Sequence, residues 1–492
     1  MVYHISQLKK YARCNRFFML EELCEKEPFN NYVRVDEELT NLVLKKLGIT
    51  EYYLGKKGDD KNRVLDAIDD YKWFAKARFE YKGLRIKIPL LHKIEDSFDV
   101  YFIYVGLYPK AHETSFYYEN LWVLKNNGIK INNIFIVYLN KDYVREEELD
   151  PNKLFLITTQ LFNNNNNPTV PLKDLLKKLS YEKNLEIELN KMDELLEKGI
   201  VPKARKTHNC VGRQRCKYYY ACFPDEEEDC NNSILTLNGA RNKNLMKERG
   251  LRRLKDADED LIEGTKIQYS QIAADKNDGL FVDKYALESW LKEITYPISF
   301  IDFEWERFAI PPYPRMKPYD VLPFEYSIHI LYEDGTVKHK VFLSTRDDRL
   351  ELTDSLLNDI PKEGSIVAYN ATAAESLRIQ ELAEQFPKYK DELLAINDRL
   401  NDLQIIFEAG VVYDVRQRGF WSLKTIMSIL DESSYKNLDI NDGMNAVYSW
   451  RNLDYDNENI DREKIVNDLK EYCAMDTYAM LVIYKWLLTL IN

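Results

Sequence analysis

Two acidic residues, Asp302 and Glu304, stand two positions apart in the aromatic and aliphatic segment ISFIDFEW, residues 298–305. This composition favours a β-strand, and side chains two apart on a strand share a face. Burying two unpaired carboxylates together is costly, and a divalent cation offsets the cost because hard cations bind carboxylate oxygens. The segment therefore predicts a metal site. The alternative is a strand whose exposed end holds both acids in solvent.

Further acids follow the next expected strands. A second strand is expected at 322–332 and a third at 365–369, and Glu375 follows the third strand at the start of a helical pattern. An acid at such a switch from strand to helix lies near the end of a central strand. The segment RLNDL then adds Asp402.

A late helical segment, LKEYCAMDTY, places Tyr472 and Asp476 four residues apart, so that they share one helix face. This order of motifs resembles the DEDD exonucleases of the ribonuclease H-like superfamily, in the tyrosine subtype. The motifs are D-x-E on a strand, an acid after a third strand, and Y-x-x-x-D on a late helix. The resemblance implies two-metal phosphodiester hydrolysis, with Tyr472 positioning the attacking water. It implies that two Mg²⁺ or Mn²⁺ ions are held by Asp302, Glu304, Glu375 and Asp476.

A closer resemblance covers almost all of residues 296–490. The strings FIDFE, LPFEYSIH, AYNATAAE, RLNDL and EYCAMDTYAM are similar, in this order, to a bacterial family, domain of unknown function 2779. Its members pair an exonuclease-like domain with an N-terminal RecB-like nuclease domain. This chain has Glu375 where the exonucleases usually have Asp, and Ala374 where Phe is expected. In addition, FWSLK at 420–424 replaces a segment that usually has Ser after Gly.

Three of the seven cysteines, Cys210, Cys216 and Cys222, are evenly spaced, and Cys14 lies near the N-terminus. In a large chain this pattern indicates a metal or cluster site rather than disulfides. One early and three late cysteines resemble the iron–sulfur clasp of RecB-like nucleases. That resemblance implies a 4Fe–4S cluster that joins the two ends of the N-terminal domain. Closing so long a loop would constrain the unfolded chain.

Other assignments of the cysteines stay open. Four thiolates also bind Zn²⁺, and His208 or Cys230 could replace one ligand. The remaining alternative is a set of unrelated buried thiols. Cys24 and Cys230 are expected to be ordinary free cysteines, and Cys473 a buried small residue.

The N-terminal domain is expected to have the PD-(D/E)XK fold of RecB-like nucleases without its active site. That site needs an acid on one strand and E-x-K on the next. The expected strands are 84–91, with Lys87 where a metal ligand should be, and 99–109, with neither Glu nor Lys. Asp96 and Asp99 are expected to flank a turn in solvent.

The net charge of −12 counts against a nucleic-acid-binding surface over the whole protein. Basic residues are instead concentrated at 203–217 and 241–255. The second segment, RNKNLMKERGLRRLK, is the better candidate for contacting phosphates, and a solvated helix face is the alternative. The predicted nucleic-acid contacts are Lys247, Arg249, Arg252, Arg253 and Lys424. For Lys424 a surface lysine at a helix start is equally compatible with the sequence.

Together these features predict an α/β protein of three parts. Residues 1–230 form the degenerate nuclease-like domain with the cysteine cluster, 231–294 a helical basic connector, and 295–492 a ribonuclease H-like, DnaQ-type exonuclease domain. No run of about 18 apolar residues occurs and no apolar stretch follows the N-terminal charges, so no membrane segment is expected and the location is expected to be cytoplasmic.

The predicted function is metal-dependent 3′–5′ exonuclease activity on single-stranded DNA or RNA ends. The alternative is a catalytically inactive nucleic-acid-binding scaffold, with protein partners in a defence or repair complex.

Overall fold

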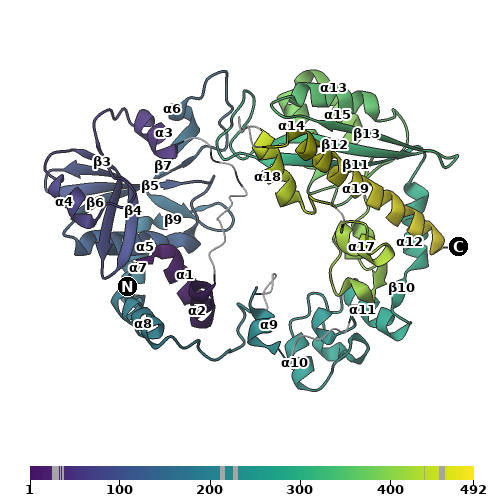
Figure 1. The fold of residues 1–492 in the computed structure, drawn as a ribbon, viewed down its shortest axis with the longest axis horizontal. Helices are drawn as coiled ribbons and strands as arrows, with labels where there is room; N and C mark the ends of the chain where they lie inside the picture. Colours follow the sequence, from purple (N-terminus) through teal and green to yellow (C-terminus); the bar gives the residue numbers. More distant parts are fainter. Residues whose placement is uncertain are drawn as a thin grey trace. The chain divides into compact units, whose positions relative to one another are not determined.

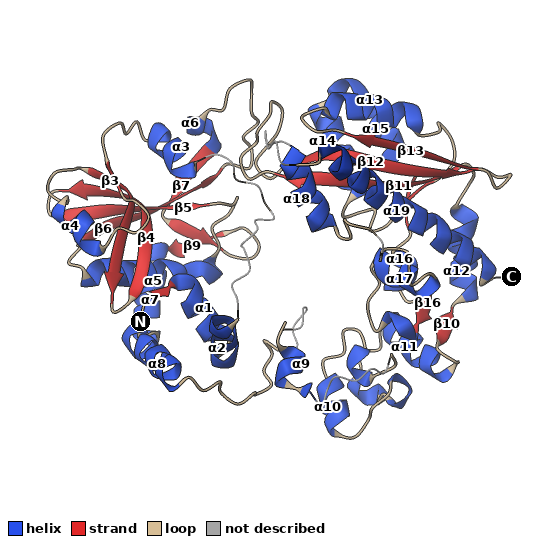
Figure 2. Ribbon diagram, viewed as in Figure 1, coloured by secondary structure: helices blue, strands red, loops and turns tan. Residues whose placement is uncertain are grey.

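A computed structural model describes residues 1–24, 33, 35, 38–210, 216–224, 231–436, 438–453 and 460–491. The chain divides into two compact units (Figure 1). Unit 1 comprises Met1–Glu227 and Phe308–Tyr319, and unit 2 comprises Glu228–Arg307 and Asp320–Asn492. Each unit has a mixed sheet and several helices, so this is a mixed α/β protein (Figure 2). The expected connector, 231–294, lies within unit 2.

Unit 1 is built on a seven-stranded mixed sheet and a two-stranded sheet. Its strands are β1 (Tyr3–His4), β2 (Tyr53–Leu54), β3 (Trp73–Tyr81), β4 (Leu84–Ile94), β5 (Ser97–Tyr104), β6 (Ile131–Leu139), β7 (Phe155–Thr158), β8 (Gln160–Phe162) and β9 (Pro168–Pro171). The large sheet has the order β2-β3-β4-β5-β6-β7, with β1 paired to β4. The pairs β3–β4, β4–β5 and β6–β7 are antiparallel, whereas β2–β3 and β5–β6 are parallel.

The described helices of unit 1 are α1 (Ile5–Arg13), α2 (Asn15–Leu23), α3 (Leu39–Lys46), α4 (Lys61–Asp66), η1 (Ala111–Glu113), α5 (Thr114–Asn126), α6 (Pro151–Leu154), α7 (Leu172–Glu182), α8 (Leu185–Lys198) and α9 (Tyr219–Cys222). All of them except α9 contribute side chains to the apolar cores that include the strands of that sheet. Along β4, Ile86 and Ile88 are buried while Lys87 is exposed, as the alternation of a strand requires. The buried side chains join a core with Leu121 of α5 and Leu189 of α8.

The prediction that Asp99 lies at a solvated turn is wrong. The turn is formed by Glu95 and the exposed Asp96, and β5 already begins at Ser97. Asp99 is only 5% exposed. Its Oδ1 accepts hydrogen bonds from the Asn132 side chain and the Asn133 backbone N–H, both at 3.0 Å. These donors satisfy a buried carboxylate inside the strand.

Unit 2 is built on a five-stranded mixed sheet and a two-stranded sheet. Its strands are β10 (Leu280–Val282), β11 (Ile298–Arg307), β12 (Val321–Leu331), β13 (Val337–Leu343), β14 (Ile366–Ala368), β15 (Leu400–Asp402) and β16 (Val412–Asp414). The large sheet has the order β13-β12-β11-β14-β15, and β10 pairs with β16. The central strand, β11, is antiparallel to β12 and parallel to β14.

Helices pack on both faces of the five-stranded sheet (Figure 1). The helices of unit 2 are η3 (Ile234–Thr236), α10 (Lys243–Glu248), η4 (Leu254–Asp256), η5 (Glu259–Leu261), α11 (Lys266–Lys276), α12 (Lys284–Glu293), α13 (Arg349–Asp359), α14 (Glu375–Gln385), η6 (Pro387–Tyr389), α15 (Lys390–Asn397), α16 (Ile405–Glu408), η7 (Val415–Gln417), α17 (Leu423–Leu430), α18 (Gly443–Leu453) and α19 (Arg462–Thr489). Phe300 of β11 packs with α12, α16, α17 and α19, whereas Ile301 and Phe303 pack with α13, α14 and α15. Since strand side chains alternate, Asp302 and Glu304 share the face of Phe300, which is the face that α19 covers.

The segment Phe308–Tyr319, between β11 and β12, belongs to unit 1. The backbone N–H of Arg145 donates to the Met316 carbonyl, and Arg145 Nη1 donates to the Pro311 carbonyl, both at 2.9 Å. The chain therefore passes between the two units more than once.

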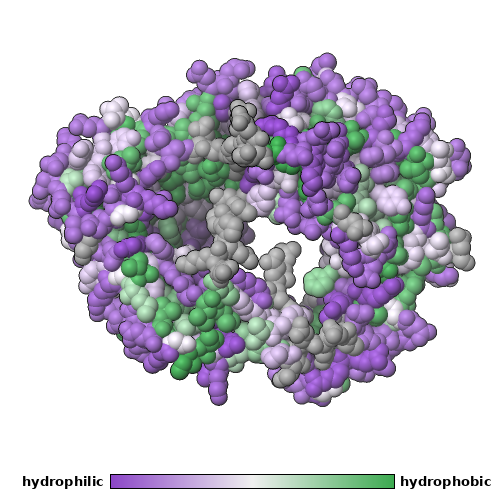
Figure 3. Space-filling view, in the orientation of Figure 1, coloured by the Kyte–Doolittle hydropathy of each residue, from purple (hydrophilic) through white to green (hydrophobic). Residues whose placement is uncertain are grey.

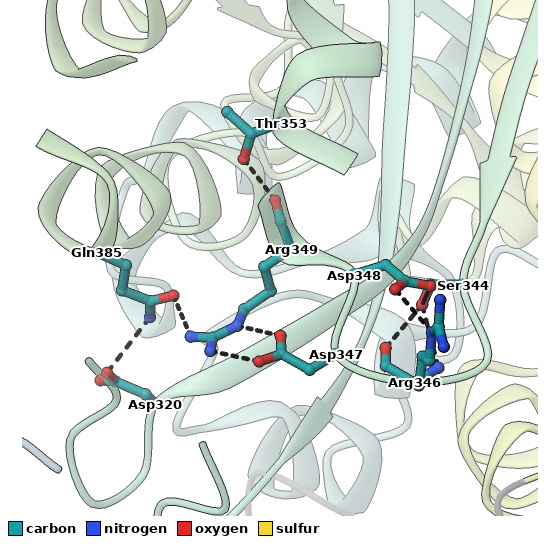
Figure 4. A network of polar contacts seen from close by, with 8 residues as sticks. All are labelled: Asp320, Ser344, Arg346, Asp347, Asp348, Arg349, Thr353 and Gln385. Atoms are coloured by element: carbon teal, nitrogen blue, oxygen red, sulfur yellow. Dashed lines mark hydrogen bonds and ion pairs between the residues drawn. The ribbon is translucent and has the colours of Figure 1, made fainter. Parts of the chain in front are cut away.

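Helix α13 of unit 2 is fixed at its first residue by a buried arginine (Figure 4). Arg349 is 3% exposed, and it donates to Asp347 from Nε at 2.6 Å and from Nη2 at 2.8 Å. Its Nη1 donates to Gln385 Oε1 at 2.7 Å, and Gln385 Nε2 donates to Asp320 at 3.4 Å. The planar guanidinium thereby ties the start of α13 to the end of α14.

None of the helices that the structure describes combines the length and the apolar character that a membrane span requires. Hydrophilic residues make up most of the surface visible in Figure 3, in keeping with a charged fraction of 30%.

We expect Arg349→Met to lower the free energy of unfolding of unit 2 by about 3 kcal/mol, because it leaves Asp347 and Gln385 without their buried partner. Arg346→Met is the matched control: the Arg346 side chain is 79% exposed and pairs with Asp348 at 3.0 Å, so its loss should change stability by less than about 1 kcal/mol. Denaturant unfolding of the two variants measures the difference. Equal effects would contradict the structural role of Arg349.

Candidate metal centre

Three acidic side chains meet between β11 and α19. Asp302 and Glu304 come from β11 and Asp476 from α19, and one oxygen of each carboxyl lies within 4.8 Å of the others. Across the described residues, no other set of three or more His, Cys, Asp or Glu side chains is grouped this closely. Glu304 is 9% exposed and Asp476 6%. The fold thus brings together the strand pair and the helix acid that the sequence patterns single out.

Burial and mutual repulsion disfavour the ionised forms of these acids. Burial raises the pKa of Asp302 well above its ordinary value, and the charges of Asp476 and Glu304 raise it further. Burial also raises the pKa of Glu304 and that of Asp476, although a hydrogen bond from Tyr435 and the charge of Lys424 limit the rise for Asp476. A divalent cation would relieve both effects, because it supplies the missing positive charge to buried oxygen ligands.

Glu375 is the first residue of α14 and lies beside the acidic group. The chain after β14 turns at Asn370, whose φ is 63°, and the Ala374 N–H donates to the Asn370 carbonyl at 3.1 Å. Glu375 is 2% exposed, and its Oε2 has no hydrogen-bond partner in the described part of the chain. Burial raises the pKa of Glu375 to about 8, with repulsion from Asp402 and Asp476 adding to the rise. The carboxyl lies outside the set grouped within 4.8 Å but close enough to interact with it.

Asp402, at the end of β15, orders the turn that leads to Glu375. Its Oδ1 accepts hydrogen bonds from the backbone N–H groups of Asn370 at 3.0 Å and of Gln404 at 2.9 Å. These bonds connect the ends of the two parallel strands β14 and β15. Asp402 therefore positions the chain around the site.

Tyr472 lies one helical turn before Asp476 on α19 and is 4% exposed. Lys424 of α17 donates from Nζ to the Tyr472 hydroxyl at 3.1 Å and to the Asn441 carbonyl at 2.5 Å. Its ammonium also lies 4.7 Å from the centroid of the Tyr472 ring. The structure thus places Lys424, expected as a possible phosphate contact, beside the tyrosine of the acidic site.

Two neighbours of the acidic group have no counterpart in the sequence analysis. The Tyr435 hydroxyl donates to Asp476 Oδ1 at 2.6 Å, and Glu325 of β12 lies opposite Glu304 in the strand pairing. Tyr435 stands in the polar stretch DESSYKNLD, which has no periodic signal. Glu325, in contrast, is the one acidic residue of VLPFEYSIHIL, and an acid in so apolar a strand is a detectable signal.

The four cysteines expected to bind a cluster line one cavity in unit 1. Cys14 lies between α1 and α2, Cys222 ends α9, and Cys210 and Cys216 bracket residues that the structure does not describe. The cavity has a volume of about 560 Å³. Among the described residues, the cysteine sulfurs are not grouped within 4.8 Å as the three carboxylates are. Cys230, the possible substitute ligand, lies outside the described residues.

Two arginines of the N-terminal helices form hydrogen bonds with the other segments that line this cavity. Arg16 donates from Nε to Cys222 Sγ at 3.1 Å and from Nη1 to the Pro202 carbonyl at 2.7 Å. The Asn209 side chain donates to the Arg13 carbonyl at 3.0 Å. The α1–α2 corner is thus bound to a segment almost 200 residues later, and a positive charge touches one of the sulfurs.

The basic residues expected to contact phosphates lie on α10 and on the loop that leads to η4. Arg253 pairs with Asp275 at 2.8 Å, and Arg249 pairs with Asp258 at 3.6 Å. The Asp275 side chain is 2% exposed, so Arg253 compensates a buried charge within unit 2. Arg252 is exposed, and Lys247 is partly buried.

The fold and the site together define a mixed α/β protein with a buried acidic centre. Residues 299–422 match the domain of unknown function DUF2779. The matched segment includes β11 with Asp302 and Glu304 and the start of α14 with Glu375, and it ends before α19. No curated protein and no solved structure matches the chain.

We expect the metal-free protein to lose stability as the pH rises from about 5 to about 8. Burial raises the pKa of Glu375, and that of Glu325, from the usual 4.5 to about 8. The stabilisation from their protonated forms is present below pH 4.5 and is lost as the pH rises through the folded pKa. Each such group contributes a slope of roughly 1.4 kcal/mol per pH unit.

Thermal unfolding in EDTA at several pH values measures this loss. Glu375→Gln should make the profile less steep by roughly 1.4 kcal/mol per pH unit, because Glu325 still contributes its own slope. Added Mn²⁺ should restore stability most strongly at pH 8. A profile in EDTA that is the same for the wild type and Glu375→Gln would contradict the expectation.

Proposed function

We propose that unit 2 is a metal-dependent 3′–5′ exonuclease that acts on single-stranded ends of DNA or RNA. The observation that carries the proposal is the meeting of Asp302, Glu304 and Asp476 within 4.8 Å, with Tyr472 one helical turn away. A ribonuclease H-like fold is compatible with a central strand that has one antiparallel and one parallel neighbour and helices on both faces.

The residues present fit two Mg²⁺ or Mn²⁺ ions, with Asp302, Glu304, Glu375 and Asp476 as the oxygen ligands. The carboxyl groups are buried and close together, and Glu375 Oε2 lacks a hydrogen-bond partner among the described residues. Bound at these oxygens, the ions would stabilise charge on the attacking and leaving oxygens of phosphodiester hydrolysis.

Tyr472 and Lys424 would act on the attacking water and on the phosphate of the substrate. The Tyr472 hydroxyl would orient the attacking water, and Lys424, 3.1 Å away, would keep that hydroxyl in place. The ammonium of Lys424 would also offset charge on a phosphate oxygen. Tyr435 would hold the Asp476 carboxyl through its 2.6 Å hydrogen bond.

We expect stepwise shortening of single-stranded substrates from the 3′ end, with Mg²⁺ or Mn²⁺ and not with EDTA. Substrates labelled at either end, in DNA and RNA, show the direction and the preferred sugar. The double variant Asp302→Ala/Asp476→Ala should be inactive, because it removes two ligands. Glu471→Ala, an exposed acid on the same helix, is the matched control and should retain wild-type activity.

A further variant, Tyr472→Phe, should lower the rate by roughly 10²-fold or more and leave metal binding intact. Failure of folded, metal-supplied protein to cleave any of these substrates would contradict the enzyme proposal. It would favour the alternative, a non-catalytic nucleic-acid-binding scaffold in a defence or repair complex.

For unit 1 we propose a PD-(D/E)XK-like fold without nuclease activity. Lys87 is exposed on β4, and β5 (SFDVYFIY) has neither the Glu nor the Lys that the chemistry needs. Its one acid, Asp99, is engaged by two donors from β6. The remaining role of unit 1 would be to hold nucleic acid or partner proteins for unit 2.

We further propose that Cys14, Cys210, Cys216 and Cys222 bind a 4Fe–4S cluster. All four line one cavity of about 560 Å³, and Arg16 offers a positive charge to a thiolate. A single Zn²⁺ ion would bring its sulfurs to about 3.8 Å from one another, since Zn–S bonds are about 2.3 Å long. Among the described residues, no three of the cysteine sulfurs are grouped within 4.8 Å, which favours the larger cluster, and zinc stays the alternative.

Anaerobically purified protein should contain about four iron and four sulfide per chain. Cys222→Ser should lose iron and lower the unfolding temperature of unit 1, because the clasp between its two ends is then broken. Cys24→Ser, an exposed cysteine outside the cavity lining, is the control and should keep the iron. Zinc in place of iron would support the alternative, and protein without either metal would contradict both.

A further inference from the structure

Glu325, on β12, is a buried carboxyl without a hydrogen bond or an ion pair in the described part of the chain. It is 0% exposed, and neither of its oxygens has a hydrogen-bond partner among the described residues. The rest of β12 is apolar or uncharged, and most of it is buried. Burying such a group without a partner costs free energy comparable to several lost hydrogen bonds.

The buried acids outside the metal centre show how the rest of the chain handles the same cost. Each of them has a donor: Lys183 for Glu119 at 2.7 Å, Arg451 for Glu306, Arg416 for Asp414 at 2.6 Å, and Asn133 for Asp99 at 3.0 Å. The buried carboxyl oxygens that lack a donor in the described residues belong to Glu325, Glu375 and Glu119, and Glu119 already pairs with Lys183 through its other oxygen.

The strand register places Glu325 at the metal centre. In the antiparallel pair β11–β12, Glu325 is directly opposite Glu304, so the two side chains lie on the same face. The pairing shifts immediately after Glu304, and such a bulge re-aims the neighbouring side chains. Helix α19 packs on β12, and its Cys473 faces the same group of acids.

Two like-charged side chains opposite each other in a sheet repel. The charge of Lys470 on α19 acts on Glu325, but the two form no ion pair in the described structure. A divalent cation between Glu304 and Glu325 would compensate both carboxylates at once. We propose that Glu325 is a fifth carboxylate of the metal centre and binds the same divalent cation as Glu304. The inference rests on the metal centre of the proposed function, and it adds a ligand that the D-x-E, Glu375 and Asp476 pattern does not include.

Calorimetric titration of the metal-free protein with Mn²⁺ at one fixed pH tests this ligand without relying on activity. Glu325→Gln, which keeps the shape of the side chain, should bind Mn²⁺ roughly 10- to 100-fold more weakly than the wild type. Glu333→Gln, an exposed acid just after β12, is the matched control and should bind as the wild type does. Asp302→Asn should lose most of the binding.

The outcomes separate this inference from the proposed function. If Asp302→Asn loses Mn²⁺ while Glu325→Gln retains wild-type affinity and stoichiometry, Glu325 is not a ligand, and the proposal of a metal centre is still supported. If the folded wild type binds no Mn²⁺, both are wrong. Thermal unfolding in EDTA checks that Glu325→Gln is folded. Should it not fold, Glu325→Asp replaces it: the shorter acid should also weaken Mn²⁺ binding, and unchanged affinity would contradict the inference.

Discussion

The burial of several carboxyl groups side by side between β11 and α19 is the main physical constraint on the structure of unit 2. Asp302, Glu304 and Asp476 lie within 4.8 Å of one another, and Glu375 and Glu325 border them with few donors of their own. Such a cluster does not stabilise the fold by itself, because burial and repulsion both oppose ionisation of the carboxyl groups. The cluster is explained if the folded state normally binds a cation there, since the binding free energy then offsets the cost of assembling the acids.

The architecture around the cluster keeps the acids in place despite their repulsion. Phe300 anchors β11 to α19 on one face, and Ile301 and Phe303 anchor it to α13, α14 and α15 on the other. Asp476 is followed on α19 by Met480, Tyr484 and Leu487, which belong to the same core as Phe300. The apolar packing therefore fixes the spacing of the carboxyl groups, and the buried Arg349 network ties α13 to the end of the helix that Glu375 begins.

Much of this site follows from local sequence periodicity. The two-residue spacing of Asp302 and Glu304 and the four-residue spacing of Tyr472 and Asp476 each determine a shared face, so these pairs could be predicted without the fold. Contacts that depend on strand register or on loop conformation could not be predicted from the sequence. Glu325 meets Glu304 only because β12 pairs with β11 in one particular register, and Tyr435 reaches Asp476 from a stretch without periodicity. The residues alone do not locate the start of β5 at Ser97, and for this reason they predict Asp99 at a turn.

Unit 1 depends on a different kind of link, one between distant parts of the chain. The corner between α1 and α2 is bound to the segment around Asn209 and Cys222 by hydrogen bonds and by the shared cysteine cavity. A cluster there would stabilise unit 1, whereas a metal ion at the acidic site of unit 2 would perform chemistry. Anomalous diffraction from crystals grown with Mn²⁺ tests directly whether the acidic site of unit 2 binds a metal ion. We expect manganese density between Asp302, Glu304 and Asp476. Well-ordered carboxyl groups without manganese between them would contradict it.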